Sequence, residues 1–385
     1  MQRIKQGTTI LASLLIICLI LGFFPVSVFA DDLSGSEGEA TEEEIKVLTL
    51  AEAVQQAIDF NRKMIDNELT IRQLEDIRER TAQRVMSDTY SYEPGSLLEA
   101  ASKQRLLSLM QTDIDLDLLK RQQDIEEESI ANTVKQLFFE IQELNTEMEV
   151  MRQNLQLENN KYRIDQIKHQ LGLVSSFQVN QSRLGLDAFN QRMEAVDRQL
   201  AEAWNRLSFL LGEKDLSEYT LEEIERLEED FTLGNVETVI LRRVNSDPYV
   251  QMQERLIEKA ELNLRLYTYT DTGESYEMRR LGLEKEKNQL KNIKENLREV
   301  IISRHKMLEG LLKQREALLT EMEQMENQLK NLELFLQAGM ITRIEVEEAA
   351  AGFGQLGLGL KRLENQIEQL KDLFEKPYLA PQYLQ

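Results

Sequence analysis

The sequence predicts an all-α protein whose long helices pair into two repeated antiparallel coiled-coil hairpins. Proline, which interrupts helices, is absent from residues 95–247 and 249–376. Charged residues make up 30% of the chain and aromatic residues only 6%, which favours long helices over a β-sandwich or an α/β enzyme. The third observation is a heptad spacing of apolar residues.

This spacing begins at Val134, where apolar residues alternate at intervals of three and four positions: Val134, Leu137, Ile141, Leu144, Met148, Met151 and Leu155. Residues 290–300 and 322–336 follow the same rhythm, which is that of a coiled-coil seam. If residues 96–170 and 275–337 each form one helix, they span about 110 Å and about 95 Å.

Residues 1–30 are typical of a secretory signal peptide. Arg3 and Lys5 precede an apolar run, and small residues stand before an expected cleavage site after Ala30. The only cysteine, Cys18, lies inside this segment. We therefore expect an exported mature chain without disulfides or thiolate metal sites.

The mature chain is strongly acidic. The whole sequence has a net charge of −22, and removing the two basic residues of the signal gives about −24 (44 basic against 68 acidic residues). This charge argues against nucleic-acid partners, which need a basic surface. Residues 31–47 are acidic and rich in small residues, so we expect a flexible leader. No run of 18 apolar residues follows the signal, so we expect no transmembrane helix.

An internal repeat follows the leader. Residues 171–179 parallel residues 338–346, each after a long heptad helix. Gly172 and Gly339 fit a helix C-terminus with positive φ, and Ser175 and Thr342 fit the N-caps of returning helices over residues 176–211 and 343–375. The pattern predicts two helix reversals of one design.

The repeat suggests the organisation of the chain. The first helical repeat is predicted over residues 48–212, beginning with Thr49 in a capping box. An acidic link over 213–232, a second repeat over 233–376 and a tail over 377–385 follow.

The ordered set resembles the TolC-type outer-membrane efflux proteins. It comprises a Leu48-Thr49-Leu50-Ala51-Glu52-Ala53 start, a long heptad helix, the Gly-Leu-Val-Ser turn at 172–175 and an ending at Leu210-Leu211-Gly212, all then repeated. The resemblance covers about residues 48–376.

The resemblance implies a non-catalytic export conduit. In this family three chains, each contributing two hairpins, close into a hollow α-barrel. The glycine turns lie at its tip and meet a membrane-fusion adaptor, which links the tunnel to an inner-membrane pump of the ABC or a similar class. We therefore expect a homotrimer with no cofactor, metal or catalytic residue.

One feature departs from the family, whose repeats each carry two strands of an outer-membrane β-barrel. A membrane strand needs about 9–11 residues, whereas the corresponding segments here are Thr89–Tyr92 and Tyr267–Thr270. We expect these strands to be absent or reduced to stubs. The resemblance implies a location in the outer membrane, whereas the departure from the family's strands would fit a location at the cell surface.

The two turns are the predicted adaptor-docking sites: Leu171, Gly172, Leu173, Val174, Ala338, Gly339, Met340 and Ile341. Exposed apolar side chains there could contact a partner helix. The alternative is an ordinary αα-turn whose apolar residues hold its two helices together.

Glu345 and Glu348 occupy positions where the family can carry acidic gate residues in the tunnel. A ring of carboxylates would attract cations. The alternative is that both simply stabilise the start of a helix, and the first repeat has Gln178 and Gln181 instead.

The remaining motifs give weaker indications of function. The acidic triplet Asp113, Asp115 and Asp117 lacks the glycine and glutamate of a calcium loop, so we interpret it as a solvated patch. His169 and His305 do not have the spacing of metal ligands, and there is no Gly-x-Ser-x-Gly motif, which disfavours a hydrolase.

The main alternative function is a secreted coiled-coil structural or regulatory protein of the envelope.

Overall fold

The computed structural model describes residues 46–87, 93, 96–216, 218–224, 233–267 and 274–384, all within one unit, Ile45–Gln385. The first half contains β1 (Lys46–Leu48), α2 (Leu50–Phe60), α3 (Arg62–Ser87), α4 (Leu97–Gln170) and α5 (Ser176–Leu211). The second contains β2 (Tyr219–Leu221), α6 (Val236–Ser246), α7 (Pro248–Arg265), α8 (Tyr276–Gln337), α9 (Arg343–Glu375), η1 (Pro377–Leu379) and η2 (Gln382–Leu384).

The predicted fold class is confirmed, because nearly all of these elements are helices and the longest two have 74 and 62 residues. The order of a short, a medium, a very long and a long helix occurs twice, as α2–α5 and α6–α9. In the described ranges, no helix combines the length and the apolar character needed to cross a membrane.

Side-chain caps fix where the helices begin. Thr49 Oγ1 accepts a hydrogen bond from the Glu52 amide at 3.2 Å, and the Glu52 carboxylate accepts one from the Thr49 amide at 3.3 Å. Ser96 caps α4 through the Glu99 amide at 3.1 Å, and Ser275 caps α8 through the Met278 amide at 3.2 Å. These bonds satisfy amide groups that have no partner within the helix.

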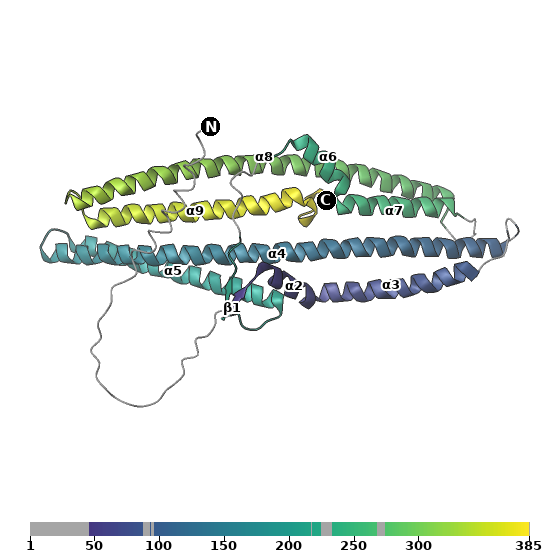
Figure 1. The fold of residues 1–385 in the computed structure, drawn as a ribbon, viewed down its shortest axis with the longest axis horizontal. Coiled ribbons are helices and arrows are strands. Elements are labelled where there is room, and N and C mark those ends of the chain that lie inside the picture. Colours follow the sequence, from purple (N-terminus) through teal and green to yellow (C-terminus); the bar gives the residue numbers. More distant parts are fainter. Residues whose placement is uncertain are drawn as a thin grey trace, which may run out of the picture. The chain divides into compact units, whose positions relative to one another are not determined.

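The long helices form one layer. In Figure 1, α4 lies between a line made of α3 and α5 and a line made of α7 and α9, and α8 lies beyond the second line. Helix α4 pairs with α3 along one half of its length and with α5 along the other, and α8 pairs with α7 and α9 in the same way. The layer therefore ends in α8 at one edge and in α3 and α5 at the other.

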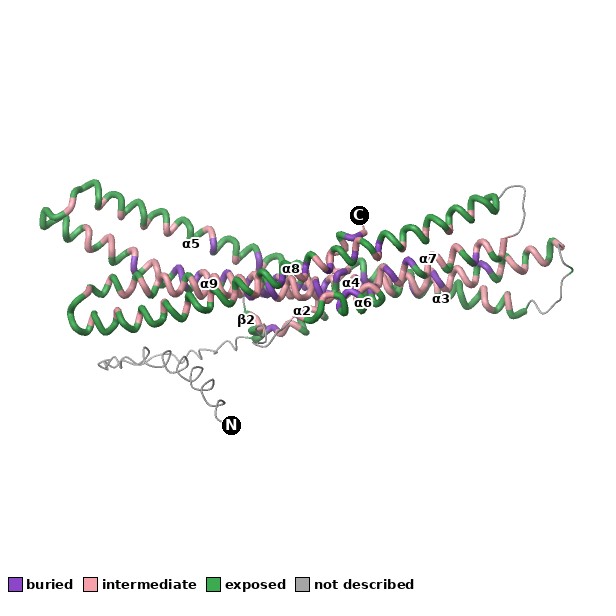
Figure 2. Tube along the Cα trace, turned by 90° about the horizontal axis from the view of Figure 1, so that it is seen from above, coloured by how far each residue is buried: buried purple, intermediate pink, exposed green. Residues whose placement is uncertain are grey.

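The buried core lies towards the middle of the long helices. Figure 2 shows buried positions gathered there, whereas the hairpin ends are mostly exposed. One cluster packs Ala53 and Ala57 of α2 on Val134, Phe138 and Ile141 of α4. A second cluster packs α6 on Ile293, Leu297 and Ile301 of α8. Small alanines allow α2 to approach α4 closely.

The chain end after α9 is held by a buried arginine. Arg304 of α8 is 6% exposed and donates hydrogen bonds to the carbonyl oxygens of Leu373 at 2.6 Å, Pro377 at 3.3 Å and Ala380 at 2.8 Å. These acceptors include carbonyls that the end of a helix leaves without a partner. Burial lowers the pKa of this guanidinium, although the nearby Tyr383 acts in the opposite direction.

Two strands correct the predicted organisation. Lys46 and Val47, assigned to the flexible leader, form β1, which pairs in parallel with β2 in the predicted acidic link. The stretches predicted as stubs lie outside the described residues, apart from Tyr267.

The acidic triplet, predicted as a solvated patch, is partly exposed and is also ion-paired. It lies inside α4 and makes ion pairs with both neighbouring helices: Asp113 with Arg78, Asp115 with Lys259 at 2.5 Å, and Asp117 with Arg255 at 2.8 Å. Asp117 also pairs with Arg121 at 3.0 Å. Burial raises the pKa of Asp117, but the hydrogen bonds and charges of these two arginines outweigh it and lower the pKa below its usual range.

Candidate functional site

The first reversal, between α4 and α5, is built on a glycine. Gly172 has φ of +71°, a conformation that only glycine adopts without strain. Its amide donates to the His169 carbonyl at 2.9 Å, and the Leu173 amide donates to the Lys168 carbonyl at 2.8 Å. This pair of bonds defines a Schellman motif, so the prediction of a reversal at Gly172 is confirmed.

The second reversal, between α8 and α9, has the same geometry. Gly339 has φ of +70°, its amide donates to the Leu336 carbonyl at 2.9 Å, and the Met340 amide donates to the Phe335 carbonyl at 2.9 Å. Both reversals lie at the same end of the layer in Figures 1 and 2. The duplicated sequence therefore produces two equivalent turns side by side.

Each returning helix starts directly after its predicted N-cap residue. Ser175 Oγ accepts from the Gln178 amide at 3.3 Å, and the Glu345 carboxylate accepts from the Thr342 amide at 2.8 Å. At the first turn, Nδ1 of His169 also lies 2.9 Å from the Val174 carbonyl oxygen. These bonds fix the path of the backbone through the first turn.

The turns expose only part of their predicted apolar set. Leu171, Leu173 and Met340 are 69%, 70% and 71% exposed, whereas Val174 and Ile341 are half-buried. Exposed apolar residues also flank the turns: Phe177, Leu334 and Phe335. The sequence analysis did not assign these three to the site, although an aromatic residue in the first turn of α5 was a signal.

The two carboxylates predicted as a gate have structural partners. Glu345 caps α9 through Thr342, as described above. Glu348 is half-exposed and pairs with Lys161 of α4 at 3.0 Å. Burial alone would lower the pKa of Lys161, but hydrogen bonds to Glu348 and Glu158 raise it above its usual value. Glu345 and Glu348 thus lie near each other at the start of α9, and the ion pair of Glu348 with Lys161 joins the two hairpins.

A second link lies beside this ion pair. The Asn160 side-chain amide donates to the Glu347 carboxylate at 3.3 Å. Further along α9, Lys361 donates to Thr146 Oγ1 at 2.7 Å, and Arg362 pairs with Glu143 at 2.9 Å and Glu147 at 2.6 Å. These contacts join α9 to α4, so the two turns are held at one level.

One face of the layer carries two grooves. A polar groove of about 570 Å³ lies over α4 and is lined by Glu140, Glu143 and Glu147, and a more apolar groove of about 590 Å³ lies between α8 and α9. Both grooves include Gln366 and Gln369 of α9, so they open on the same face. The three glutamates lie about 200° around α4 from the residues that pack on α2. This grooved face is therefore opposite to the face covered by α2.

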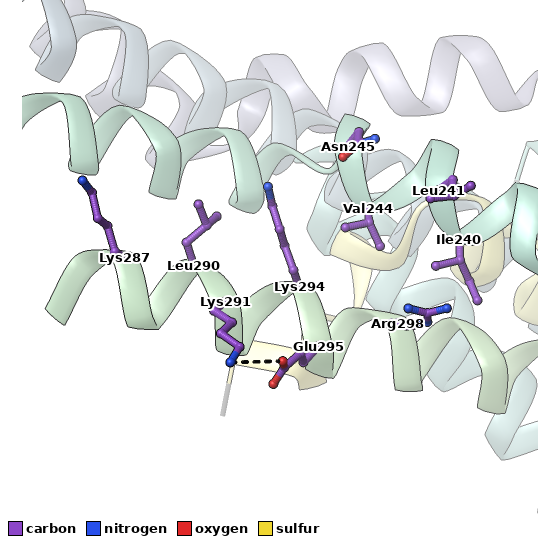
Figure 3. Close-up of a pocket in the computed structure, with 10 residues that line it drawn as sticks. All are labelled: Ile240, Leu241, Val244, Asn245, Lys287, Leu290, Lys291, Lys294, Glu295 and Arg298. Atoms are coloured by element: carbon purple, nitrogen blue, oxygen red, sulfur yellow. Dashed lines mark ion pairs between the residues drawn. The ribbon is translucent and has the colours of Figure 1, made fainter. Parts of the chain in front are cut away.

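A cleft of about 450 Å³ lies between α6 and α8 and is lined by basic residues of α8 (Figure 3). Lys287 pairs with Glu261 at 2.8 Å and Lys294 pairs with Glu254 at 2.8 Å, both on α7, while Lys291 pairs with Glu295 at 3.9 Å. The ion pairs of Lys287 and Lys294 join α7 to α8, whereas that of Lys291 lies within α8. Arg298 of α8 also lines the cleft.

Among the described residues, no group of three or more His, Cys, Asp or Glu side chains is placed to hold a metal. His305 Nε2 lies 3.4 Å from the Gly234 carbonyl oxygen, far from His169.

The fold is similar to that of solved outer-membrane channels. The structure of CusC aligns over 86% of this chain and 91% of its own, with a TM-score of 0.59 and 12% identity. VceC from Vibrio cholerae aligns over 86% of this chain and 96% of its own (TM-score 0.60, 12% identity). The CmeC outer-membrane channel of Campylobacter jejuni aligns over 92% and 93% (TM-score 0.52, 10% identity). The chain therefore has the fold of the TolC-type outer-membrane channels.

No family model matches the chain, and no curated protein matches it by sequence.

Proposed function

We propose that this protein is the extracytoplasmic conduit of an export complex, in which three copies close into a tube that docks on a membrane-fusion adaptor through the glycine turns. The observation that carries this proposal is the pair of equivalent reversals at one end of a TolC-type helical layer, with Leu173 and Met340 projecting from them. Its activity is passage of cargo, with no chemical step.

The two edges of the layer support the assembly. A layer that ends in α8 on one side and in α3 and α5 on the other has two different edges. Edge-to-edge contact between copies is then head-to-tail, and such contacts close into a ring when the rotation permits. Exposed apolar residues on α3, such as Leu69 (51%) and Ile77 (49%), gain burial in this contact.

The grooved face is the proposed wall of the tunnel. It is the polar side of the layer, with Glu140, Glu143 and Glu147 on α4 and amide side chains on α9. The opposite face carries α2 in the core cluster of the first repeat. A polar wall remains wetted, as a conduit for water-soluble cargo requires. The proposed location is the cell envelope, with the turns directed towards the inner-membrane pump.

The turns are the proposed adaptor site. Leu173 and Met340 project where a helical partner could bury them, whereas Val174 and Ile341 are half-buried in the single chain. The proposal of a gate at Glu345 and Glu348 is separate. It predicts that Glu345→Gln and Glu348→Gln change the ion selectivity of a reconstituted trimer, and unaltered selectivity would contradict it.

A crosslinking experiment in living cells tests the docking proposal. A photoreactive amino acid is placed at Leu173 or Met340, with Leu97 at the opposite end as the matched control, since it is 90% exposed. We expect adducts with an adaptor protein from positions 173 and 340 and none from 97. Equal labelling from all three positions, or no adaptor adduct, contradicts the proposal.

A second test uses the glycines. Replacing Gly172 and Gly339 by bulky residues should abolish recovery of the adaptor in a pull-down while circular dichroism shows unchanged helix content. If the glycine variant still recovered the adaptor in the pull-down, adaptor binding would not depend on the turns, which would contradict the proposal.

A further inference from the structure

The cleft between α6 and α8 has a counterpart in the first repeat, because the two repeats correspond residue by residue. Lys120 of α4 pairs with Glu75 of α3 at 2.7 Å, and Lys287 of α8 pairs with Glu261 of α7 at 2.8 Å. The long helices α4 and α8 are thus related by a shift of 167 residues, and α2 and α3 are related to α6 and α7 by a shift of 186. Each residue of the cleft can therefore be compared with one of the first repeat.

The charge of the cleft differs from that of its counterpart. Four basic residues of α8 line the cleft: Lys287, Lys291, Lys294 and Arg298. The first of these has a basic counterpart, whereas the other three correspond to Asp124, Glu127 and Ala131. Among the described residues that line the cleft, Glu295 is the only acidic one. In a chain with a net charge of −22, this local excess of positive charge favours an anion.

The cleft is also more apolar than its counterpart. Leu241 of α6 and Leu290 of α8 line it, where the first repeat has Gln55 and Gln123. The Leu241 side chain is 68% exposed and lies next in sequence to Ile240, a buried residue that also lines the cleft. An aliphatic chain placed on this surface would be removed from water together with the exposed leucine.

Two of the basic groups are available to a ligand. Lys291 lies 3.9 Å from Glu295, which is beyond hydrogen-bonding distance. Arg298 is exposed and makes no ion pair with any residue that the structure describes. Figure 3 shows Arg298 beside Ile240, so the charge and the apolar surface are adjacent. A guanidinium group binds a phosphate or carboxylate through two parallel hydrogen bonds.

We propose that this cleft binds a free anionic amphiphile. The phosphate or carboxylate head group of the ligand lies on Lys291 and Arg298. Its aliphatic chain lies on Leu241 and Leu290. The cleft volume of about 450 Å³ is within the range of small-molecule sites.

The position of the cleft favours a dissolved ligand over a membrane lipid. Lys287, the cleft residue nearest the start of α8, stands 11 positions after Tyr276, which is about 17 Å along the helix. A membrane surface at that end of the layer would not reach the cleft.

The cleft also lies apart from the proposed tunnel wall. Helix α6 is the counterpart of α2, which covers the face opposite to the two grooves, and the cleft shares no described residue with either groove. The ligand is therefore distinct from cargo in the tunnel, and the inference does not depend on the proposed function.

Titration calorimetry of the mature chain with decyl phosphate, kept below its micelle-forming concentration, tests the site. We expect one saturable site per chain. Butyl phosphate has the same head group on a short chain, and decyltrimethylammonium has the same long chain with the opposite charge. Each should bind at least about tenfold more weakly than decyl phosphate.

The first repeat supplies the variant that removes the chemistry of the cleft. Leu241→Gln, Lys291→Asp and Arg298→Ala together copy residues 55, 124 and 131, which stand at the same positions of equivalent helices. This triple variant should bind decyl phosphate at least about tenfold more weakly, with unchanged circular dichroism and solution mass. The matched control is Lys306→Asp, which reverses an exposed charge of α8 outside the cleft and should weaken binding less than about twofold.

Several results would overturn the proposal. Absence of decyl phosphate binding, or equal binding by the triple variant and the original chain, would exclude the site. Equal binding of decyltrimethylammonium would indicate a purely apolar surface, and equal binding of a hexaglutamate peptide would indicate a site for acidic protein segments. Binding to phosphatidylglycerol vesicles without binding of dissolved decyl phosphate would indicate a membrane contact. Each of these outcomes contradicts a site for a free anionic amphiphile.

Discussion

The two repeats share their turns but end their last helices differently. In the first repeat α5 ends at Gly212, which has φ of +71° and leads towards β2. In the second repeat α9 ends at Lys376, and Arg304 binds the carbonyl groups beyond it. The counterpart of Arg304 in the first repeat is Leu137, a buried core residue. The same position of the repeat thus contributes an apolar side chain to the core in the first repeat, whereas in the second repeat its side chain binds the carbonyl groups at the end of a helix.

The difference follows from the distinct structural roles of the turns and of the ends of α5 and α9. The turns must reverse two helices at the same level, and a single glycine geometry achieves this twice. The last helices continue into different segments, a link to the second repeat after α5 and the tail after α9. Local side chains therefore carry the difference, and substitutions at them should affect one repeat only.

The largest expected effect is at Arg304. Arg304→Leu makes the second repeat resemble the first, but it leaves three carbonyl acceptors without their charged donor, which should cost about 3–5 kcal/mol of unfolding free energy. Chemical denaturation at a fixed protein concentration measures the loss, and hydrogen exchange should rise in residues 373–384. Lys306→Ala, on the exposed side of α8, is the control and should change stability by less than about 0.5 kcal/mol. Equal behaviour of the two variants would refute the role of Arg304.

The next effect concerns Asp247, which caps α7. It accepts from the amides of Tyr249 at 3.0 Å and Val250 at 3.2 Å and from the Tyr383 hydroxyl at 2.8 Å, while its counterpart Asn61 caps α3. Asp247→Ala removes all three bonds and should cost about 2–3 kcal/mol. Asp247→Asn copies the first repeat and should cost less.

The pH dependence of this site has a defined sign. Burial raises the pKa of Asp247 above its ordinary value of 3.8, although bonds to Tyr383 and the two amides oppose the rise. The folded state therefore holds this proton to higher pH than the unfolded state, so this group's contribution to stability falls as pH rises from about 3.8 through the raised pKa. Because asparagine does not titrate, thermal melts of Asp247→Asn should not show this loss of stability with rising pH. Identical pH profiles of the variant and the original protein would contradict the role of Asp247.

Gly212 gives the third effect, confined to the first repeat. A Cβ atom at this position would overlap the ring of Phe60, and the positive φ adds strain. Gly212→Ala should cost about 2–3 kcal/mol, and about 1 kcal/mol should remain in a Phe60→Ala background, where only the backbone strain persists. Denaturation of the three variants measures the coupling, and an unchanged cost in the Phe60→Ala background would exclude the overlap.

The turns should respond equally. At Gly172 and Gly339 an added Cβ meets no atom within 4 Å, so only the backbone strain counts. Gly172→Ala and Gly339→Ala should each cost about 1 kcal/mol. A difference above about 0.5 kcal/mol in denaturation would show that the turns are not equivalent.

The smallest effect should be a gain. Gly357 lies inside α9, and a Cβ there also meets nothing within 4 Å. Gly357→Ala should stabilise the protein by about 0.5–1 kcal/mol, because alanine loses less backbone entropy in a helix. A destabilised variant in thermal melts would indicate that this glycine is needed for close contact in the assembly.

Local signals in the sequence predicted the hairpins well. The ranges expected for α5 and α9, 176–211 and 343–375, agree with the structure because a glycine and a cap mark each start. The strands β1 and β2 were missed, since segments of three residues in acidic stretches show no alternation.

Contacts between distant segments were harder to predict. The ion pair of Asp115 with Lys259 joins residues 144 positions apart, and no local pattern indicates such a partner. At the turns, the sequence did not reveal that Leu173 projects while Val174 is half-buried, because this depends on how the two helices pack.

The central claim is that copies of this layer close into a tube. Electron microscopy of the mature protein viewed along the helix axes tests it most directly. The account predicts a closed ring with threefold symmetry and a hollow centre, in which α8 of each copy lies against α3 and α5 of the next. Solid bundles, open chains of copies or separate single layers would contradict it.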